Sequence, residues 1–185
     1  MNMDLLQQLA ALVATRNDIG ARITKLTGRP SQIGHLGEFI AAEIFGISLE
    51  QSAANKGFDG RFRTGPFAGR TVDVKWYAKR EGGVDLRLDS LPDFDLVLVG
   101  PAGVASSSRG DDRPWLLEGV HLFDANALVG ALRARGLKVG IATSVARPHW
   151  DQAEIYPVPR NNMLTLSAGQ RQALKLFGAA NQSAR

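Results

Sequence analysis

Asp73 and Lys75 have the residue types and the spacing that best suit hydrolytic chemistry in this sequence. They stand two positions apart in the segment VDVKW, residues 72–76. Its alternation of apolar and polar residues predicts a strand with Asp73 and Lys75 on one face. A carboxylate there can bind a hard cation, and an ammonium can orient water or phosphate. The ordinary alternative for such a pair is a solvated ion pair.

Asp59 is a second acid that we expect to lie beside Asp73. Residues 57–62 and 69–77 read as two strands separated by a turn near Pro66, and we expect them to form an antiparallel hairpin. This hairpin would bring Asp59 next to Asp73. A turn at Asp59 itself is the alternative, since Asp-Gly is common in turns, although Phe58 favours the start of a strand.

Glu38 is the third candidate acid. It lies in a predicted helix that runs from an N-cap at Ser31 to about residue 45 and ends at Gly46. The helix neighbours three and four positions away are Gly34, His35, Ala41 and Ala42. We expect no basic partner for Glu38 among them, so that a sheet can approach it closely. An ordinary surface glutamate is the alternative, and a structural role is the simpler interpretation of His35.

The remaining pattern predicts helices and strands in mixed order. We expect one or two packing helices over residues 4–27, because Leu5, Leu9 and Leu12 begin an apolar stripe at helical spacing. The run FDLVLV, residues 94–99, predicts a central strand covered on both faces. Further expectations are a strand at 115–123, a helix capped by Asp124 through residue 135, an extended segment at 137–143, a helix at about 167–177 and a polar surface loop at 105–114.

The composition limits the class of protein. With 185 residues and 44% hydrophobic content, the chain can form one domain around one core. It has no cysteine, so any metal ion must have oxygen or imidazole ligands, which suits Mg²⁺ or Mn²⁺. No segment resembles a signal peptide or reaches the roughly 20 apolar residues that span a bilayer. We therefore expect a cytoplasmic protein without a membrane partner.

Positive charge gathers around the candidate acids. Residues 56–80 hold seven basic and two acidic residues, a net charge of +5, whereas the whole chain carries +4. Such a window attracts a phosphate backbone, although basic residues also serve solubility. We expect nucleic-acid contacts from Lys56, Arg61, Arg63, Lys79 and Arg80.

The order of Glu38 on a helix, then Asp59, then Asp73-Val74-Lys75 on a strand resembles the PD-(D/E)xK, or restriction endonuclease-like, nuclease superfamily. The resemblance covers roughly residues 31–100, and Phe58 stands where the motif is named for a proline. It implies an α/β fold with a restriction endonuclease-like core, a mixed central β-sheet flanked by helices. The implied order is α-β-β-β-α-β with extra N- and C-terminal helices. We expect one domain over residues 1–185, with packing helices at 1–30, the core at 31–145 and a C-terminal extension at 146–185.

The resemblance also implies roles for individual residues. Asp59 and Asp73 would bind Mg²⁺ or Mn²⁺ directly, with the Val74 carbonyl as a further ligand and Glu38 as a ligand or a water-mediated partner. Lys75 would orient and activate the attacking water or steady the phosphate. Together Glu38, Asp59, Asp73 and Lys75 would form the catalytic set.

The implied function is that of a metal-dependent nuclease, with DNA endonuclease as the leading activity. One alternative is a catalytically inactive nucleic-acid-binding module with the same fold, and another is an unrelated domain that holds the motif by chance. The sequence does not distinguish DNA from RNA or endonuclease from exonuclease, and it names no pathway. The sequence is compatible with a homodimer but gives no evidence for one.

Overall fold

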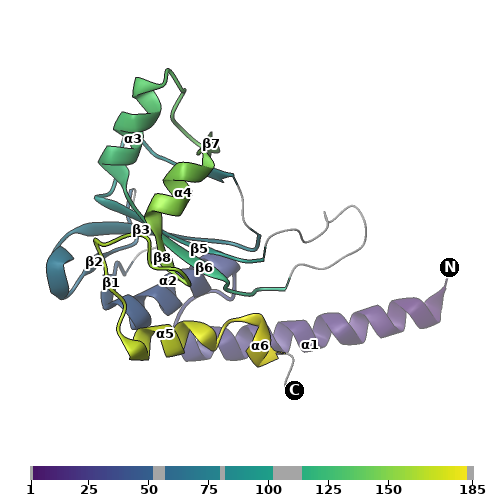
Figure 1. Ribbon diagram of the computed structural model, residues 1–185. Helices are drawn as coiled ribbons and strands as arrows, with labels where there is room; N and C mark the ends of the chain where they lie inside the picture. Colours follow the sequence, from purple (N-terminus) through teal and green to yellow (C-terminus); the bar gives the residue numbers. More distant parts are fainter. Residues whose placement is uncertain (1, 52–56, 80–81, 102–113, 183–185) are drawn as a thin grey trace.

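A mixed six-stranded sheet forms the centre of the protein (Figure 1). The computed structural model describes residues 2–51, 57–79, 82–101 and 114–182. In spatial order the strands are β1 (Ile47–Leu49), β2 (Gly60–Phe62), β3 (Thr71–Tyr77), β5 (Phe94–Val99), β6 (Gly119–Asp124) and β8 (Glu154–Tyr156). β3 and β5 are parallel, and the other neighbouring pairs are antiparallel. A separate two-stranded sheet pairs β4 (Gly83–Val84) with β7 (Thr143–Ser144).

Helices cover both faces of the six-stranded sheet (Figure 1). One face carries α2 (Ile33–Phe45) and α5 (Ala168–Lys175), and the other carries α3 (Ala125–Ala134) and α4 (Arg147–Ala153). The short elements η1 (Gly65–Phe67) and α6 (Ala179–Gln182) complete the order. On β5, Leu96 and Leu98 pack on the α2 side, while Val97 and Val99 pack on the α3 side. The predicted α/β class is therefore confirmed.

Several local predictions agree with the structure. β2 and β3 form the predicted antiparallel hairpin, with Gly60 opposite Val72. All residues of β5 are buried, as expected for a central strand. Asp124 caps α3 by accepting a hydrogen bond from the Ala127 amide at 2.9 Å. Gly46 ends α2 in the left-handed conformation, at φ 67°.

Other predictions need correction. The N-cap of α2 is Gln32 rather than Ser31, and the helix begins at Ile33. The strand expected at 115–123 begins at Gly119, and only Thr143 of the segment 137–143 joins a strand. Six strands, β1 to β6, lie between α2 and α3, more than the order α-β-β-β-α-β allows. β1 and β4 have three and two residues, too short for a periodic pattern in the sequence. The loop expected at 105–114 lies outside the described residues, apart from Pro114.

α1 (Met3–Thr27) is a single helix of 25 residues that extends away from the rest of the molecule (Figure 1). It is capped by Asn2 and ends at Gly28, but none of its residues is buried. The stripe that we expected to pack is exposed, with Leu5 at 60%, Leu9 at 52% and Leu12 at 68%. The predicted packing of this stripe is therefore not observed among the described residues. No described helix has the length and apolarity needed to cross a membrane.

Candidate active site

β3 separates the polar pair from its apolar neighbours. Val72, Val74 and Trp76 are buried in the core on the α2 side, so Asp73 and Lys75 point to the opposite face. The Lys75 ammonium donates a hydrogen bond to Asp73 Oδ2. The strand thus places the two side chains together on one face, as the alternation predicts.

Asp59 lies directly before β2 and against β3. Its amide donates to the Val72 carbonyl at 2.9 Å, and its Oδ2 accepts from the Val74 amide at 2.7 Å. Burial raises the pKa of Asp59 to about 8, and its hydrogen bond and charge interaction with Asp73 act in the same direction, although the Val74 amide lowers it. The hairpin therefore brings the two carboxylates together as expected, and without a cation they hold a proton near neutral pH.

Asp95 is a further acid of the site that the sequence analysis missed. Parallel pairing of β3 with β5 sets Asp95 directly beside Asp73. Its side chain is 1% exposed, and Oδ1 accepts a hydrogen bond from Lys75 Nζ at 2.5 Å. Oδ2 is buried without a hydrogen-bond partner among the described atoms. The available signal was an acid inside the apolar run of residues 94–99, since a charge is rarely fully buried unless it is paired.

Lys75 is held between Asp73 and Asp95 as a cation. Burial opposes its charged form, but the charges of Asp95 and Asp73 and their hydrogen bonds outweigh burial and raise the pKa of Lys75. Burial also raises the pKa of Asp95, an effect that the Lys75 charge partly offsets. An ammonium in this setting donates hydrogen bonds and does not accept a proton, so Lys75 can orient a water or a phosphate but cannot serve as a general base.

Glu38 has basic partners, which corrects the prediction that it lacks them. Its Oε2 accepts a hydrogen bond from Arg29, and its Oε1 lies 3.2 Å from His35 Nδ1. Arg29 precedes α2 and is therefore outside the helical spacing that we considered; it also donates to the Glu50 carbonyl at 2.8 Å. Glu38 does not line the cavity described below, but its charge acts on Asp59, and its role as a metal ligand or water-mediated partner stays a prediction.

A cavity of about 240 Å³ opens over the acids and the lysine. Its lining residues are Gly57, Phe58, Asp59, Asp73, Lys75, Asp85 and Arg87. Asp85 and Arg87 were not singled out in the sequence. Asp85 Oδ1 accepts a hydrogen bond from the Ala142 amide at 2.6 Å, which ties the cavity wall to the segment before β7. Arg87 adds a second cationic side chain, suited to an anionic group of a ligand.

The structure describes three of the five residues that we expect to contact nucleic acid. Arg61 pairs with Thr71 across β2 and β3 and so lies on the same face of the sheet as Asp73. Its guanidinium lies 4.8 Å from the ring centroid of Phe58, which lines the cavity. Arg63 is exposed directly after β2, and Lys79 is half-buried after β3. Lys56 and Arg80 lie outside the described residues.

The site offers two carboxylate ligands that suit a hard cation. Asp59 and Asp73 offer adjacent carboxylates whose mutual repulsion a divalent cation would relieve. In the described parts of the chain, however, no three His, Asp or Glu side chains are arranged to hold a metal ion. The amide of Val74 donates a hydrogen bond to Asp59. The role expected for the Val74 carbonyl, as a metal ligand, stays a prediction. Water or a substrate would have to supply the remaining ligands.

Two comparisons of the sequence with known proteins found no match. No family model matches the chain, and no curated protein matches its sequence. The function must therefore be inferred from the chemistry of the site.

Without a divalent cation, the stability of the protein is expected to fall as the pH rises from about 4 to about 8. The folded state keeps the proton of Asp59 up to a pKa of about 8, whereas the unfolded state loses it near 3.8. Over that window the unfolded state binds fewer protons, so deprotonation favours unfolding. Urea denaturation in EDTA should show this slope, and Asp59→Asn should reduce it. Equal slopes for the two proteins would contradict the raised pKa.

Proposed function

We propose that this protein is a metal-dependent nuclease that hydrolyses phosphodiester bonds, with DNA as substrate and endonuclease as its activity. The observation that carries the proposal is the convergence of Asp59, Asp73 and Lys75 at one cavity, where two carboxylates hold a proton and an ammonium is fixed beside them. Perturbed carboxylates that face a cavity mark candidate active sites, and hydrolysis of a phosphodiester is favoured by charges placed around the reacting phosphate.

Each residue of the site has a separate role in the proposed hydrolysis. Mg²⁺ or Mn²⁺ bound by Asp59 and Asp73 would neutralise phosphate charge and lower the pKa of a water molecule. Lys75 donates hydrogen bonds to the attacking water or to a phosphate oxygen. Asp95 positions Lys75 through the 2.5 Å hydrogen bond and keeps it charged. Arg87 lines the same cavity and can bind a second phosphate oxygen.

The arrangement of the elements supports a restriction endonuclease-like core. Helix α2 precedes β2 and β3, Asp59 stands before the first of these strands, and the Asp73-Val74-Lys75 segment lies on the second. The order of Glu38, Asp59 and Asp73-Val74-Lys75 on these elements agrees with the resemblance, although more strands lie between α2 and α3 than the implied order contains. In this proposal Glu38 acts as a charge that orders Arg29 and His35 near the site.

The choice of a nucleic acid follows from the charges around the cavity. Arg61 lies on the site face and Arg63 is exposed one position beyond β2, so both can contact phosphates that flank a bound phosphodiester. Such contacts make affinity fall with rising salt concentration. We propose DNA as the substrate, and the experiment below also tests RNA.

The test is incubation of the purified protein with supercoiled, linear, single-stranded and branched DNA, and with RNA, in Mg²⁺, Mn²⁺ or EDTA. We expect cutting of circular DNA with either cation and none in EDTA. Circular DNA has no ends, so its cleavage identifies an endonuclease. Binding of DNA without cutting of any substrate would replace the proposal with the inactive binding module, and cutting of RNA alone would change the substrate.

A further inference from the structure

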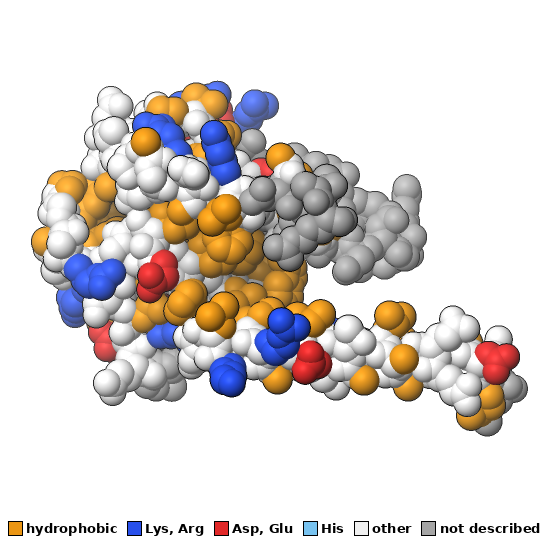
Figure 2. Space-filling model, turned by 90° about the horizontal axis from the view of Figure 1, so that it is seen from below, with side chains coloured by type: hydrophobic (Ala, Val, Ile, Leu, Met, Phe, Trp, Pro, Cys, Tyr) orange, Lys and Arg blue, Asp and Glu red, His pale blue; other side chains and the backbone are white. Residues whose placement is uncertain are grey.

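The exposed helix α1 has the sequence pattern of a helix that pairs with another helix. Its apolar positions alternate spacings of four and three, which is the heptad pattern of a coiled-coil seam. The seam consists of Leu5, Leu9, Leu12, Arg16, Ile19, Ile23 and Leu26. Every residue from 2 to 19 is exposed, so the first half of the seam is open to solvent (Figure 2). Since helices of this kind gain most of their stability by packing one face, a partner for this seam is expected.

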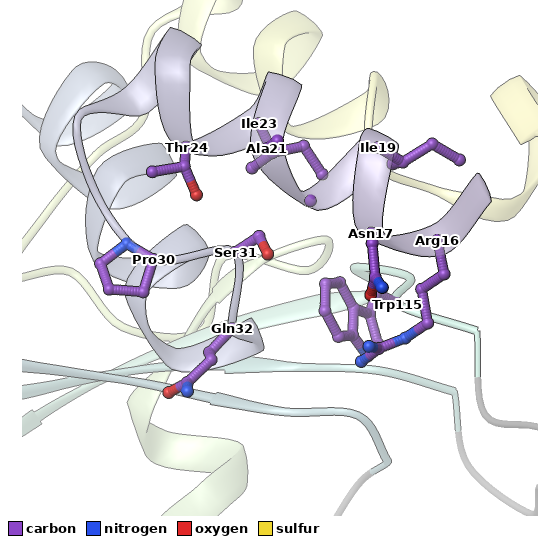
Figure 3. A pocket seen from close by; sticks show the side chains of 11 residues that line it. Arg16, Asn17, Ile19, Ala21, Ile23, Thr24, Pro30, Ser31, Gln32 and Trp115 are labelled. Atoms are coloured by element: carbon purple, nitrogen blue, oxygen red, sulfur yellow. The ribbon is translucent and has the colours of Figure 1, made fainter. Parts of the chain in front are cut away.

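Ile19 and Ile23 of the second half of the seam line a groove on the body of the protein, whereas Leu26 is 82% exposed and does not. The groove has a volume of about 540 Å³ and lies between α1 and the chain at residues 30–32 and 115. Figure 3 shows Ile19 and Ile23 on the α1 side and Pro30, Gln32 and Trp115 on the other. Trp115 is 39% exposed, an unusual value for so large an apolar ring. The groove can accept apolar side chains from an additional helix.

We propose that this surface binds a second copy of the chain, with the two α1 helices antiparallel. The first half of each α1 would enter the groove of the other copy. Leu9 of one copy would then face Ile19 of the other, and Leu5 would face Ile23. One two-fold axis generates both contacts, so the dimer is closed.

The charges of α1 favour the antiparallel direction. Arg16 is the one polar residue of the seam, and in a parallel pair in register it would meet Arg16 of the other copy. In the antiparallel pair it faces Leu12, and its guanidinium can reach solvent. The dipoles of two antiparallel helices also attract each other, which favours the same arrangement.

The mass of the protein in solution tests the dimer. Light scattering after gel filtration should give twice the mass of one chain, whereas Leu12→Glu should give the mass of one. Leu12 is 68% exposed, so its replacement removes little buried surface within the chain. The matched control is Ala14→Glu, which adds the same charge on the opposite side of α1 and should leave the dimer intact.

Three results would overturn the proposal. These are a wild-type protein that is monomeric at all concentrations, a Leu12→Glu variant that dimerises as the wild type does, and a monomer that sediments with vesicles of anionic phospholipid. The last result would make α1 a membrane-surface helix.

Cysteine cross-linking tests the direction, because the chain has no native cysteine. The double variant Leu9→Cys/Ile19→Cys should form disulfides between two chains under oxidation. Leu9→Cys alone should not, since the two copies of residue 9 lie far apart in an antiparallel pair. Efficient cross-linking of Leu9→Cys alone would show a parallel pair and overturn the arrangement proposed here.

Discussion

Asp73→Asn is expected to lower Mg²⁺-dependent cleavage of DNA by roughly a hundredfold to a thousandfold, the range found when one preorganised charge-stabilising group is removed. The change keeps the shape of the side chain but removes the negative charge that Asp59 and Lys75 both contact. Cleavage rates at saturating Mg²⁺ measure the effect. Binding of Mn²⁺ by calorimetry should weaken in parallel.

Asp89→Asn is the matched control for that experiment, because Asp89 is exposed and does not line the cavity. This variant should cut and bind Mn²⁺ as the wild type does. Circular dichroism should show that both variants are folded. If Asp73→Asn cuts as fast as the wild type, the site assigned here is wrong, or a contaminating nuclease causes the cleavage.

Lys75→Met is expected to lower the free energy of unfolding at neutral pH by about 3–5 kcal/mol, the usual cost of removing one partner of a buried ion pair. It would leave Asp95, 1% exposed, without its hydrogen-bond donor and its counter-charge. Urea denaturation measures the loss. The double variant Lys75→Met/Asp95→Asn should recover part of it, because the carboxylate of Asp95, the most buried charge of the pair, is then neutral.

The pH dependence of Lys75→Met should reveal the unpaired carboxylate. Burial already raises the pKa of Asp95, and without the Lys75 charge that pKa should rise further. The folded state then holds a proton that the unfolded state releases, so the variant regains stability as the pH falls. Lys138→Met, at an exposed position, is the control and should stay near the wild type. A Lys75→Met protein as stable as the wild type at neutral pH would contradict the buried pair.

The parts of the site that the sequence could predict depend on short-range geometry. Alternation along one strand places Asp73 with Lys75, and one hairpin places Asp59 beside them. These three residues lie within one segment of 17 residues, and their placement depends only on strand periodicity and one turn. The coarse α/β class follows from the same patterns.

The parts that the sequence could not predict depend on contacts between distant segments. Asp95 joins the site through the register of two parallel strands, which no local pattern specifies. Arg29 contacts Glu38 from the segment between α1 and α2, where it also donates to the carbonyl of Glu50, directly after β1. The stripe of α1 looks the same in the sequence whether it packs on its own chain or on another one.

The order of the sheet limits how copies of this protein can associate. The outermost strands, β1 and β8, have three residues each, and the long strands β3, β5 and β6 lie inside. A free strand edge offers unpaired amides and carbonyls as a template for joining sheets, and a short edge offers few of them. Sheet extension between molecules, which leads to open-ended aggregation, is therefore disfavoured in the described part of the fold.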